Sequence, residues 1–401
     1  MLLAGPVARA ETIYSVQKIG IPEGASYSRG VALNDHGQMA VTTGSAGYRW
    51  APGTGFTPLG SATTESRGVY VQDINNSGHI VGYETAGDWS EHAFDWNGSF
   101  TDLGNLDPSP NGQNPLAQAK GINDNGWVVG NSKVFVNFTP FRHVLSMESL
   151  ARPGSHGYAI DVNSSNVIAG TVSDWSYVAH AYKWWPDGTY TELGTGGVAA
   201  INDLGQVAGS TTTGRACVWD ADGTLRTYGI LPYSQQSSSA ARDINEQGQV
   251  VGYSRNSGTG IHDRRYATLW DPDGTIHDLN TMTANLDGWK LVEATGINEA
   301  GQICGYGSAD QYAGSDQQAF LLTPIQMVMS SEVVSTPDGP ALRLSWPAGD
   351  TTAILQASDS LEPGSWSEVT TGIVVEGSEF VHSVPLGPEH PPRQFFRLYR
   401  P

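Results

Sequence analysis

Cysteine, lysine and long apolar runs are all scarce in this 401-residue sequence. Cys217 and Cys304 are the only cysteines, and they occupy apolar positions two repeats apart, so we expect two small buried side chains rather than a disulfide. Only five lysines accompany a net charge of −19, which argues against nucleic acid or an anionic membrane surface as a partner. No apolar run approaches the roughly 20 residues needed to span a bilayer.

Glycine and proline are abundant instead, with 49 and 22 copies, while only 15% of the residues are charged. Thr, Ser, Val and Tyr are frequent, and few stretches carry the Ala, Leu, Glu and Lys mixture typical of helices. This composition indicates β structure. The length allows about two domains.

The first ten residues form a segment of their own, residues 1–10. A short apolar piece is followed by Ala8-Arg9-Ala10, which matches the small-residue cleavage site of a signal peptide although a basic start is missing. We interpret residues 1–10 as the remnant of a signal peptide and predict an exported protein.

A repeat of the form apolar-Asn-x-x-Gly dominates the sequence up to about residue 324. Its asparagines are Asn34, Asn75, Asn123, Asn163, Asn202, Asn245 and Asn298, spaced by 41, 48, 40, 39, 43 and 53 residues. Glycine stands three residues after each asparagine except in the fourth repeat, where Asn166 replaces it, and asparagine is the usual non-glycine residue at positive φ. A second glycine follows seven residues after the asparagine in every repeat but the first, which has Val41.

Each repeat continues with an apolar strand that usually ends in Trp, then a turn and a short closing strand. Four strands in about 40 to 45 residues are the signature of a propeller blade. The seventh repeat lacks its closing strand, and Val16-Gln-Lys-Ile-Gly20 has the matching pattern at the other end of the sequence. We therefore predict an all-β chain in which residues 11–324 form a seven-bladed β-propeller closed by an N-terminal strand.

Segments such as Gly121-Ile-Asn-Asp-Asn-Gly-Trp-Val-Val-Gly130 and His92-Ala-Phe-Asp-Trp96 resemble the HAF family of probable extracellular repeats. The resemblance covers residues 12–324. It implies a bacterial, exported repeat protein, and it brings no catalytic motif.

After residue 324 the repeat stops, and residues 325–401 show strand-like alternation around Trp346. The segment Leu355-Gln-Ala-Ser-Asp-Ser-Leu361 resembles a C-terminal module of secreted bacterial proteins. We predict a small immunoglobulin-like or fibronectin-like β-sandwich, which could be a spacer or a weak adhesion module.

The variable connections of the repeats should share one face of the propeller, where binding usually resides. Asp88-Trp89-Ser90 and Asp174-Trp175-Ser176 occupy equivalent loops of the second and fourth repeats, and Tyr177 follows the latter. An exposed Trp beside Asp suits sugar stacking, whereas a Trp packed over its own blade would be structural; the packed alternative is favoured.

The loop 253–265 is the densest basic region of an acidic chain. It holds Arg255, His262, Arg264 and Arg265, which would suit an anionic ligand such as a uronic-acid polysaccharide. A solvated loop balanced by Asp263 is the favoured alternative. If the protein were a polysaccharide lyase, this cluster would neutralise the uronate, and Tyr312 or Tyr177 would serve as acid or base.

Three aspartates precede the repeat asparagine by two residues: Asp73, Asp161 and Asp243. Facing a central channel, they could hold a structural cation such as Ca²⁺, or each could bond the backbone of a neighbouring blade, which is favoured. No organic cofactor is predicted.

We predict a monomeric, non-catalytic extracellular or cell-surface protein that presents one propeller face to a carbohydrate or a protein. A secreted polysaccharide-degrading lyase or hydrolase and a purely structural envelope protein are the alternatives.

Overall fold

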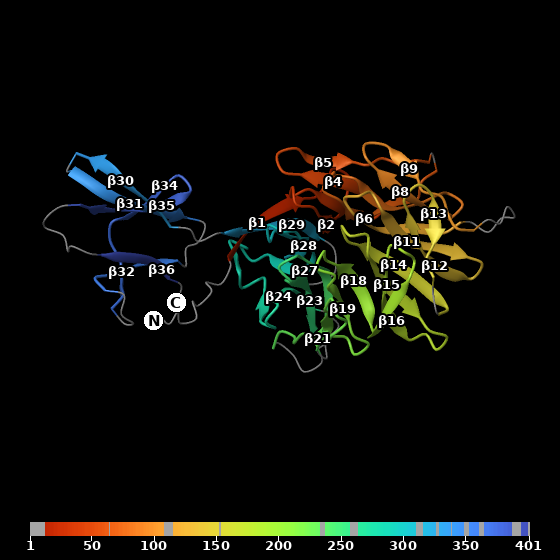
Figure 1. Cartoon of the computed structure of the whole chain (residues 1–401). Helices are drawn as coiled ribbons and strands as arrows, with labels where there is room; N and C mark the ends of the chain where they lie inside the picture. The colour runs from red at the N-terminus through yellow and green to blue at the C-terminus, as the bar shows by residue number, and fades with distance from the viewer. Residues whose placement is uncertain are drawn as a thin grey trace. The chain divides into compact units, whose positions relative to one another are not determined.

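The computed structural model describes residues 13–63, 65–107, 115–151, 154–232, 237–256, 264–309, 316–325, 329–337, 339–348, 353–360, 365–386 and 394–399 (Figure 1). Their regular secondary structure consists of β-strands. No helix long and apolar enough to cross a membrane occurs among these residues.

Six sheets of four antiparallel strands follow one another along the chain, and each is formed by consecutive strands. Blades 1 to 3 contain β2 (Arg29–Leu33), β3 (Met39–Thr42), β4 (Gly47–Ala51), β5 (Gly55–Pro58); β6 (Gly68–Ile74), β7 (Ile80–Thr85), β8 (Glu91–Trp96), β9 (Phe100–Asp102); β10 (Ala117–Ile122), β11 (Val128–Val134), β12 (Asn137–His143) and β13 (Met147–Ser149). Blades 4 to 6 contain β14 (His156–Val162), β15 (Ile168–Ser173), β16 (Ala179–Trp184), β17 (Tyr190–Thr195); β18 (Gly197–Ile201), β19 (Val207–Ser210), β20 (Ala216–Trp219), β21 (Leu225–Thr227); β22 (Ser237–Ile244), β23 (Val250–Asn256), β24 (Arg264–Trp270) and β25 (Ile276–Asp278).

The seventh blade combines both ends of the repeat region. Its strands are β27 (Lys290–Ile297), β28 (Ile303–Ser308), β29 (Gln318–Ile325), β1 (Ile13–Gly20) and β26 (Thr283–Ala284). Their order in the sheet is β26-β1-β29-β28-β27, so the N-terminal strand supplies the closing strand of the last blade, as predicted. The fifth strand, β26, pairs with β1 in parallel and was not predicted.

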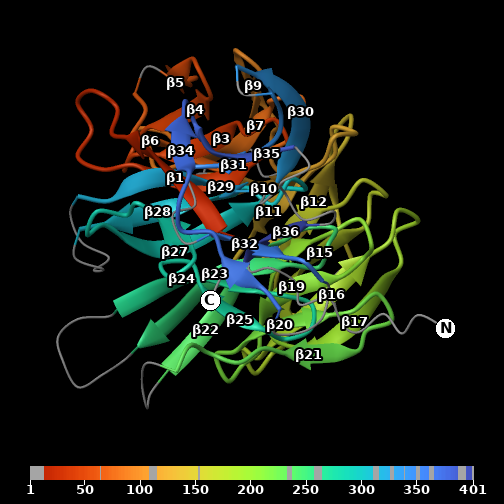
Figure 2. The same cartoon turned by 90° about the vertical axis from the view of Figure 1, so that its left-hand side faces the viewer.

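The blades follow one another around a ring, and Figure 2 shows the colour passing from red through yellow and green to cyan. The first strand of every blade lines the centre of the ring. We call the end of the ring that carries the Asn-x-x-Gly turns the turn face, and the end that carries the connections between second and third strands the loop face.

The hydrophobic core lies between successive blades. One cluster combines Ala40 and Leu59 of blade 1 with Val71 and Trp96 of blade 2. The Trp96 indole Nε1 donates a hydrogen bond to the Leu59 carbonyl at 3.2 Å. Trp184 and Trp270 make the same bond to the blade before theirs, so these three tryptophans join neighbouring blades by hydrogen bonds.

The second glycine of the repeat has a steric cause. The first strand of each blade contains a β-bulge, and in blades 2 to 7 this glycine lies against it. A Cβ on Gly170 would lie 2.1 Å from the Tyr158 carbonyl oxygen, and one on Gly252 would lie 2.0 Å from that of Ala240. No side chain can be placed at such a distance.

The chain divides into two compact units, and Val16–Thr281 with Leu286–Leu322 form the larger one. The C-terminal residues of the smaller unit form two sheets. One has the order β30 (Ser330–Thr336), β31 (Gly339–Pro347), β35 (Glu379–Pro385), β34 (Ile373–Glu376), and the other β33 (Ser367–Glu368), β32 (Ile354–Ser358), β36 (Phe395–Tyr399). Leu344, Trp346 and Leu355 are buried in their common core. This is the predicted β-sandwich.

Candidate functional site

The turn face is closed by a ring of seven asparagine side chains. Each repeat asparagine donates from Nδ2 to the backbone carbonyl of the asparagine in the next blade, over 2.8–3.5 Å, and Asn298 completes the circle with Asn34. The Oδ1 atom of the same side chain accepts a backbone N–H of its own turn. The repeat asparagine therefore both shapes its turn and fixes the spacing of the blades.

The three channel aspartates also connect neighbouring blades. Asp73 accepts the N–H groups of Ile74 and Ile122, each at 2.8 Å, and Ile122 belongs to the next blade. Asp161 and Asp243 repeat this pattern. Both oxygens of each carboxylate thus have backbone partners, which is the favoured of the two interpretations drawn from the sequence. Among the described residues, no group of three His, Cys, Asp or Glu side chains is placed to hold a metal ion.

Burial changes the acidity of these aspartates. It raises the pKa of Asp243 to about 7, and it also raises the pKa values of Asp73 and Asp161. Repulsion between the carboxylates adds to the effect at Asp73 and Asp243.

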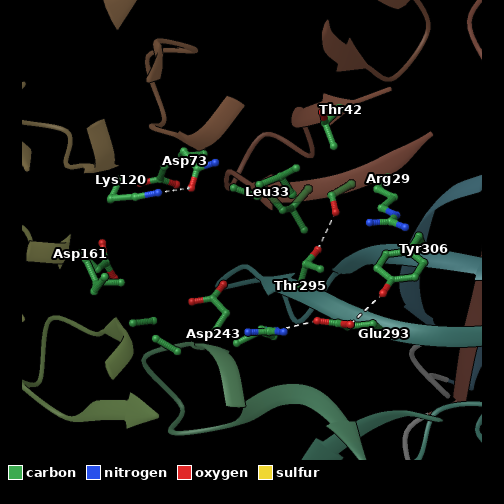
Figure 3. A pocket seen from close by; sticks show the side chains of 18 of the residues that line it. Arg29, Leu33, Thr42, Asp73, Lys120, Asp161, Asp243, Glu293, Thr295 and Tyr306 are labelled. Carbon is green, nitrogen blue, oxygen red and sulfur yellow. Dashed lines mark hydrogen bonds and ion pairs between the residues drawn. The ribbon is translucent and has the colours of Figure 1, made fainter. Parts of the chain in front are cut away.

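Above these aspartates lies a central cavity of about 540 Å³, shown in Figure 3. The residue skipped at each β-bulge lines this cavity, so every blade contributes one variable position: Val31, Gln72, Lys120, Ile160, Ala199, Arg242 and Thr295. We call these seven residues the bulge ring. The scaffold repeats around the cavity while the side chains that face it do not.

A buried ion cluster lies at one wall of the cavity. The Glu293 carboxylate, 4% exposed, receives Arg242 and Arg265, each at 2.6 Å, and the Tyr306 hydroxyl at 2.8 Å. The two guanidinium groups and the hydroxyl hold the pKa of Glu293 below its ordinary value in spite of its burial. Arg265 is therefore part of an internal cluster rather than of a basic loop.

Two other residues of the predicted basic cluster lie on the same pair of neighbouring strands, and Arg255 pairs directly with Arg265 between β23 and β24. Arg264 begins β24 and is exposed, and Arg255 lies half-buried in β23. His262 lies outside the described residues. So does Tyr312, the predicted acid or base of a lyase.

The loop face carries exposed aromatic residues on three adjacent blades. Trp89 of blade 2 is 65% exposed, Phe135 of blade 3 is 79%, and Trp175 and Tyr177 of blade 4 are 76% and 78%. We call these four residues the aromatic rim. The alternative in which Trp89 and Trp175 pack over their own blades does not describe this structure.

Three of the four rim aromatics occupy backbone positions that suit glycine. Trp89, Phe135 and Tyr177 have φ values of 69°, 55° and 62°. In blade 5 the position that corresponds to Trp89 and Tyr177 is Gly214, which makes the same turn bond to the residue three before it. Bulky side chains in this region are uncommon and strain the backbone by about 1 kcal/mol or more.

The two Asp-Trp-Ser triplets lie in corresponding loops but not at corresponding positions. Asp174 opens its turn, and its Oδ1 accepts the N–H groups of Ser176 and Val178. Asp88 is the third residue of its turn and accepts from Ser90. The structural counterpart of Trp89 is consequently Tyr177, not Trp175.

Sequence reasoning missed Phe135 because the third repeat has lost its Trp and appears degenerate. The signal was nevertheless present. Phe135 and Val136 form the two-residue turn between paired Val134 and Asn137, where Gly or Asn is usual. Two bulky apolar residues are uncommon in such a turn.

One residue of the rim has a cationic neighbour. The Arg67 guanidinium lies over the Trp89 ring, 4.1 Å from its centroid, and its Nε donates to the Gly87 carbonyl at 3.0 Å. This contact fixes the indole while leaving most of it exposed.

No curated protein matches the sequence. Solved structures with similar folds include a streptogramin B lyase, at 12% identity and a TM-score of 0.49, with 78% of this chain and 98% of that chain covered. A gluconolactonase from Xanthomonas campestris shows 11% identity and a TM-score of 0.40 over 78% and 90%. A puromycin hydrolase shows 11% and 0.40 over 84% and 52%. At these values the likenesses carry no argument about activity.

A family model described as a protein of unknown function, DUF3466, matches residues 96–323. These residues run from the end of the third strand of blade 2 to the third strand of blade 7, and they make up more than half of the chain. The chain belongs to the DUF3466 family.

Proposed function

We propose that the protein is an exported, non-catalytic binding protein that holds a carbohydrate chain on its aromatic rim. The observation that carries this proposal is the placement of Trp89, Phe135 and Tyr177 at left-handed turn positions on three adjacent blades. Glycine would relieve the backbone strain at these three positions. The exposed aromatic rings also gain no stability from packing in the core. A ligand-binding surface would explain both the strained positions and the exposed rings.

Carbohydrate suits the aromatic rim better than a flat protein surface does. Aromatic rings stack on the apolar faces of sugar rings, and one aromatic turn per blade offers a row of such contacts. Asp88 and Asp174 stand beside the tryptophans, and their carboxylates provide acceptors for sugar hydroxyl groups. Export and a place outside the cell rest on the signal-peptide remnant and on the resemblance to HAF repeats.

The test is retention on a panel of soluble polysaccharides by affinity electrophoresis, with product release followed in parallel. We expect retention without products, and we expect Trp175→Ala and Trp89→Ala to weaken it by about two- to tenfold each, since stacking contacts contribute roughly 0.5–1.5 kcal/mol. Leu225→Ala, which removes an exposed leucine of β21 in blade 5, is the matched control.

Release of oligosaccharide products would show that the protein degrades the polysaccharide, and would contradict a non-catalytic function. If the Trp variants were retained as strongly as the control, the aromatic rim would not be the polysaccharide-binding surface. If only proteins were retained, the same surface would be a protein interface.

A further inference from the structure

The central cavity contains two cations whose contacts within the described chain are with neutral groups. The Lys120 ammonium bonds the Gln72 amide oxygen at 3.3 Å and lies 5.5 Å from the Tyr83 ring centroid. Burial lowers the pKa of Lys120, and the Glu91 carboxylate opposes this effect without forming an ion pair. A half-buried ammonium held by an amide leaves its charge largely uncompensated.

Arg29 is the second such cation. Its Nε donates to the Gln317 side-chain oxygen, and its guanidinium lies over the rings of Tyr306 and Tyr27, at 4.8 and 5.2 Å. Tyr306 in turn gives its hydroxyl hydrogen to Glu293. Packing therefore holds Arg29 at the cavity wall while its charge has no carboxylate partner in the described residues.

The carboxylates of the cavity are already engaged. Glu293 is neutralised by Arg242 and Arg265. The three channel aspartates each accept two backbone N–H groups, and burial raises the pKa of each of them. None of them is paired with Lys120 or Arg29.

The bulge ring also divides the cavity by polarity. Gln72 and Lys120 come from blades 2 and 3, and Arg242 and Thr295 from blades 6 and 7. Between these two polar walls lie the apolar members, Val31 on one side and Ile160 with Ala199 on the other. Such a cavity offers charge and hydrogen bonds at two walls and apolar contact at the others.

From this arrangement we infer that the central cavity binds a small hydroxylated carboxylate of the uronic-acid type, with its anionic group at Lys120 or Arg29. A volume of about 540 Å³ lies within the usual range of small-ligand sites and has room for a sugar ring. The apolar walls suit the C–H faces of the ring, and the polar walls suit its hydroxyl groups. This inference does not rest on the aromatic rim or on the proposed function.

The experiment is isothermal titration calorimetry of the full chain with D-glucuronate and D-galacturonate, and with D-glucose and D-galactose as neutral counterparts. Lys120→Met roughly keeps the length of the side chain and removes its charge, and Arg29→Gln removes the charge of the second cation while leaving a shorter polar side chain. Leu225→Ala, at an exposed position of β21, is the control, Trp175→Ala tests whether the aromatic rim takes part, and thermal melting shows that each variant is folded.

We expect saturable binding of at least one uronate and at least tenfold weaker binding of its neutral counterpart. Lys120→Met or Arg29→Gln should weaken uronate binding tenfold or more, and Leu225→Ala should leave it unchanged. The inference would be overturned if no uronate bound saturably, or if both charge variants bound uronate as tightly as the original protein does. Loss of uronate binding in Trp175→Ala would place the ligand on the aromatic rim instead. Loss of polysaccharide retention in the Trp variants with intact uronate binding would separate the two sites.

Discussion

The two faces of the propeller are built from the same repeats, but one face carries the same residue in every blade and the other does not. On the turn face every blade has the same asparagine in the same hydrogen bonds, and the ring closes from Asn298 to Asn34. On the loop face the corresponding position is Gly214 in blade 5, Trp89 in blade 2 and Tyr177 in blade 4. One face is uniform because it holds the blades together, and we propose that the other varies because it binds the ligand.

This difference separates stability from binding within one fold. Residues that recur around the ring bond to the next blade or fit against the first strand of their own blade, so their replacement should lower stability. Residues that change from blade to blade face solvent or the central cavity, so their replacement should change binding instead. The predictions below test this separation, from the largest expected effect to the smallest.

Gly170→Val should prevent folding or lower the free energy of unfolding by about 4 kcal/mol or more, since a Cβ would lie 2.1 Å from the Tyr158 carbonyl oxygen. Circular dichroism and urea unfolding measure this. Gly197→Ala is the control, because its Cβ would meet nothing within 4 Å, and it should change stability by about 0.5 kcal/mol or less. Two variants of equal stability would refute the steric account of the repeated glycine.

Asn163→Ala should lower the free energy of unfolding by about 2–3 kcal/mol. It removes the bond to the Asn202 carbonyl at 3.1 Å and leaves the Val167 N–H without its acceptor at 2.9 Å. Asn97→Ala, an exposed asparagine directly after β8, is the matched control and should cost about 0.5 kcal/mol or less. A small effect at Asn163 would mean that the asparagine ring adds little to the cohesion of the blades.

Asp243 should make the protein less stable as pH rises from about 4 to 7. Its carboxyl has a pKa of about 7 in the folded chain and an ordinary value of 3.8, so the folded state binds the proton more tightly in this window. The contribution is complete below pH 4 and lost above pH 7, and it is on the order of 1 kcal/mol or more. Asp243→Asn, which keeps one backbone acceptor, should show a flatter decline in urea unfolding between pH 5 and 8. Parallel curves for the two proteins would contradict this.

Most of the architecture could be predicted from the sequence because each blade of a propeller leaves a recognisable repeat in the sequence. Seven asparagines at regular spacing gave the number of blades, and the missing closing strand of the last repeat located its replacement at Val16–Gly20. The left-handed Asn166 was also predicted, and its φ is 61°. Each of these features depends on turn residues or strand patterns that can be recognised in one repeat and checked against the others.

The candidate sites were harder to predict because they depend on exceptions to the repeat. The β-bulge moves one residue of each first strand out of pairing, and nothing in a single sequence shows that Lys120 and Arg242 then share a cavity. The identical Asp-Trp-Ser triplets suggested equivalent positions, whereas the hydrogen bonds of the turns offset them. The basic loop appeared as a surface cluster because sequence does not show that Arg265 bonds Glu293 in blade 7.

Tyr177→Gly tests the central claim most directly, because the backbone and the proposed ligand should prefer opposite residues at this position. Glycine at φ 62° relieves strain, so the free energy of unfolding should stay within about 0.5 kcal/mol of the original or rise, while polysaccharide retention should weaken. The measurement is urea unfolding and affinity electrophoresis of the same preparation. A variant that is clearly destabilised and still retained like the original protein would show that Tyr177 serves the fold, and would contradict the account.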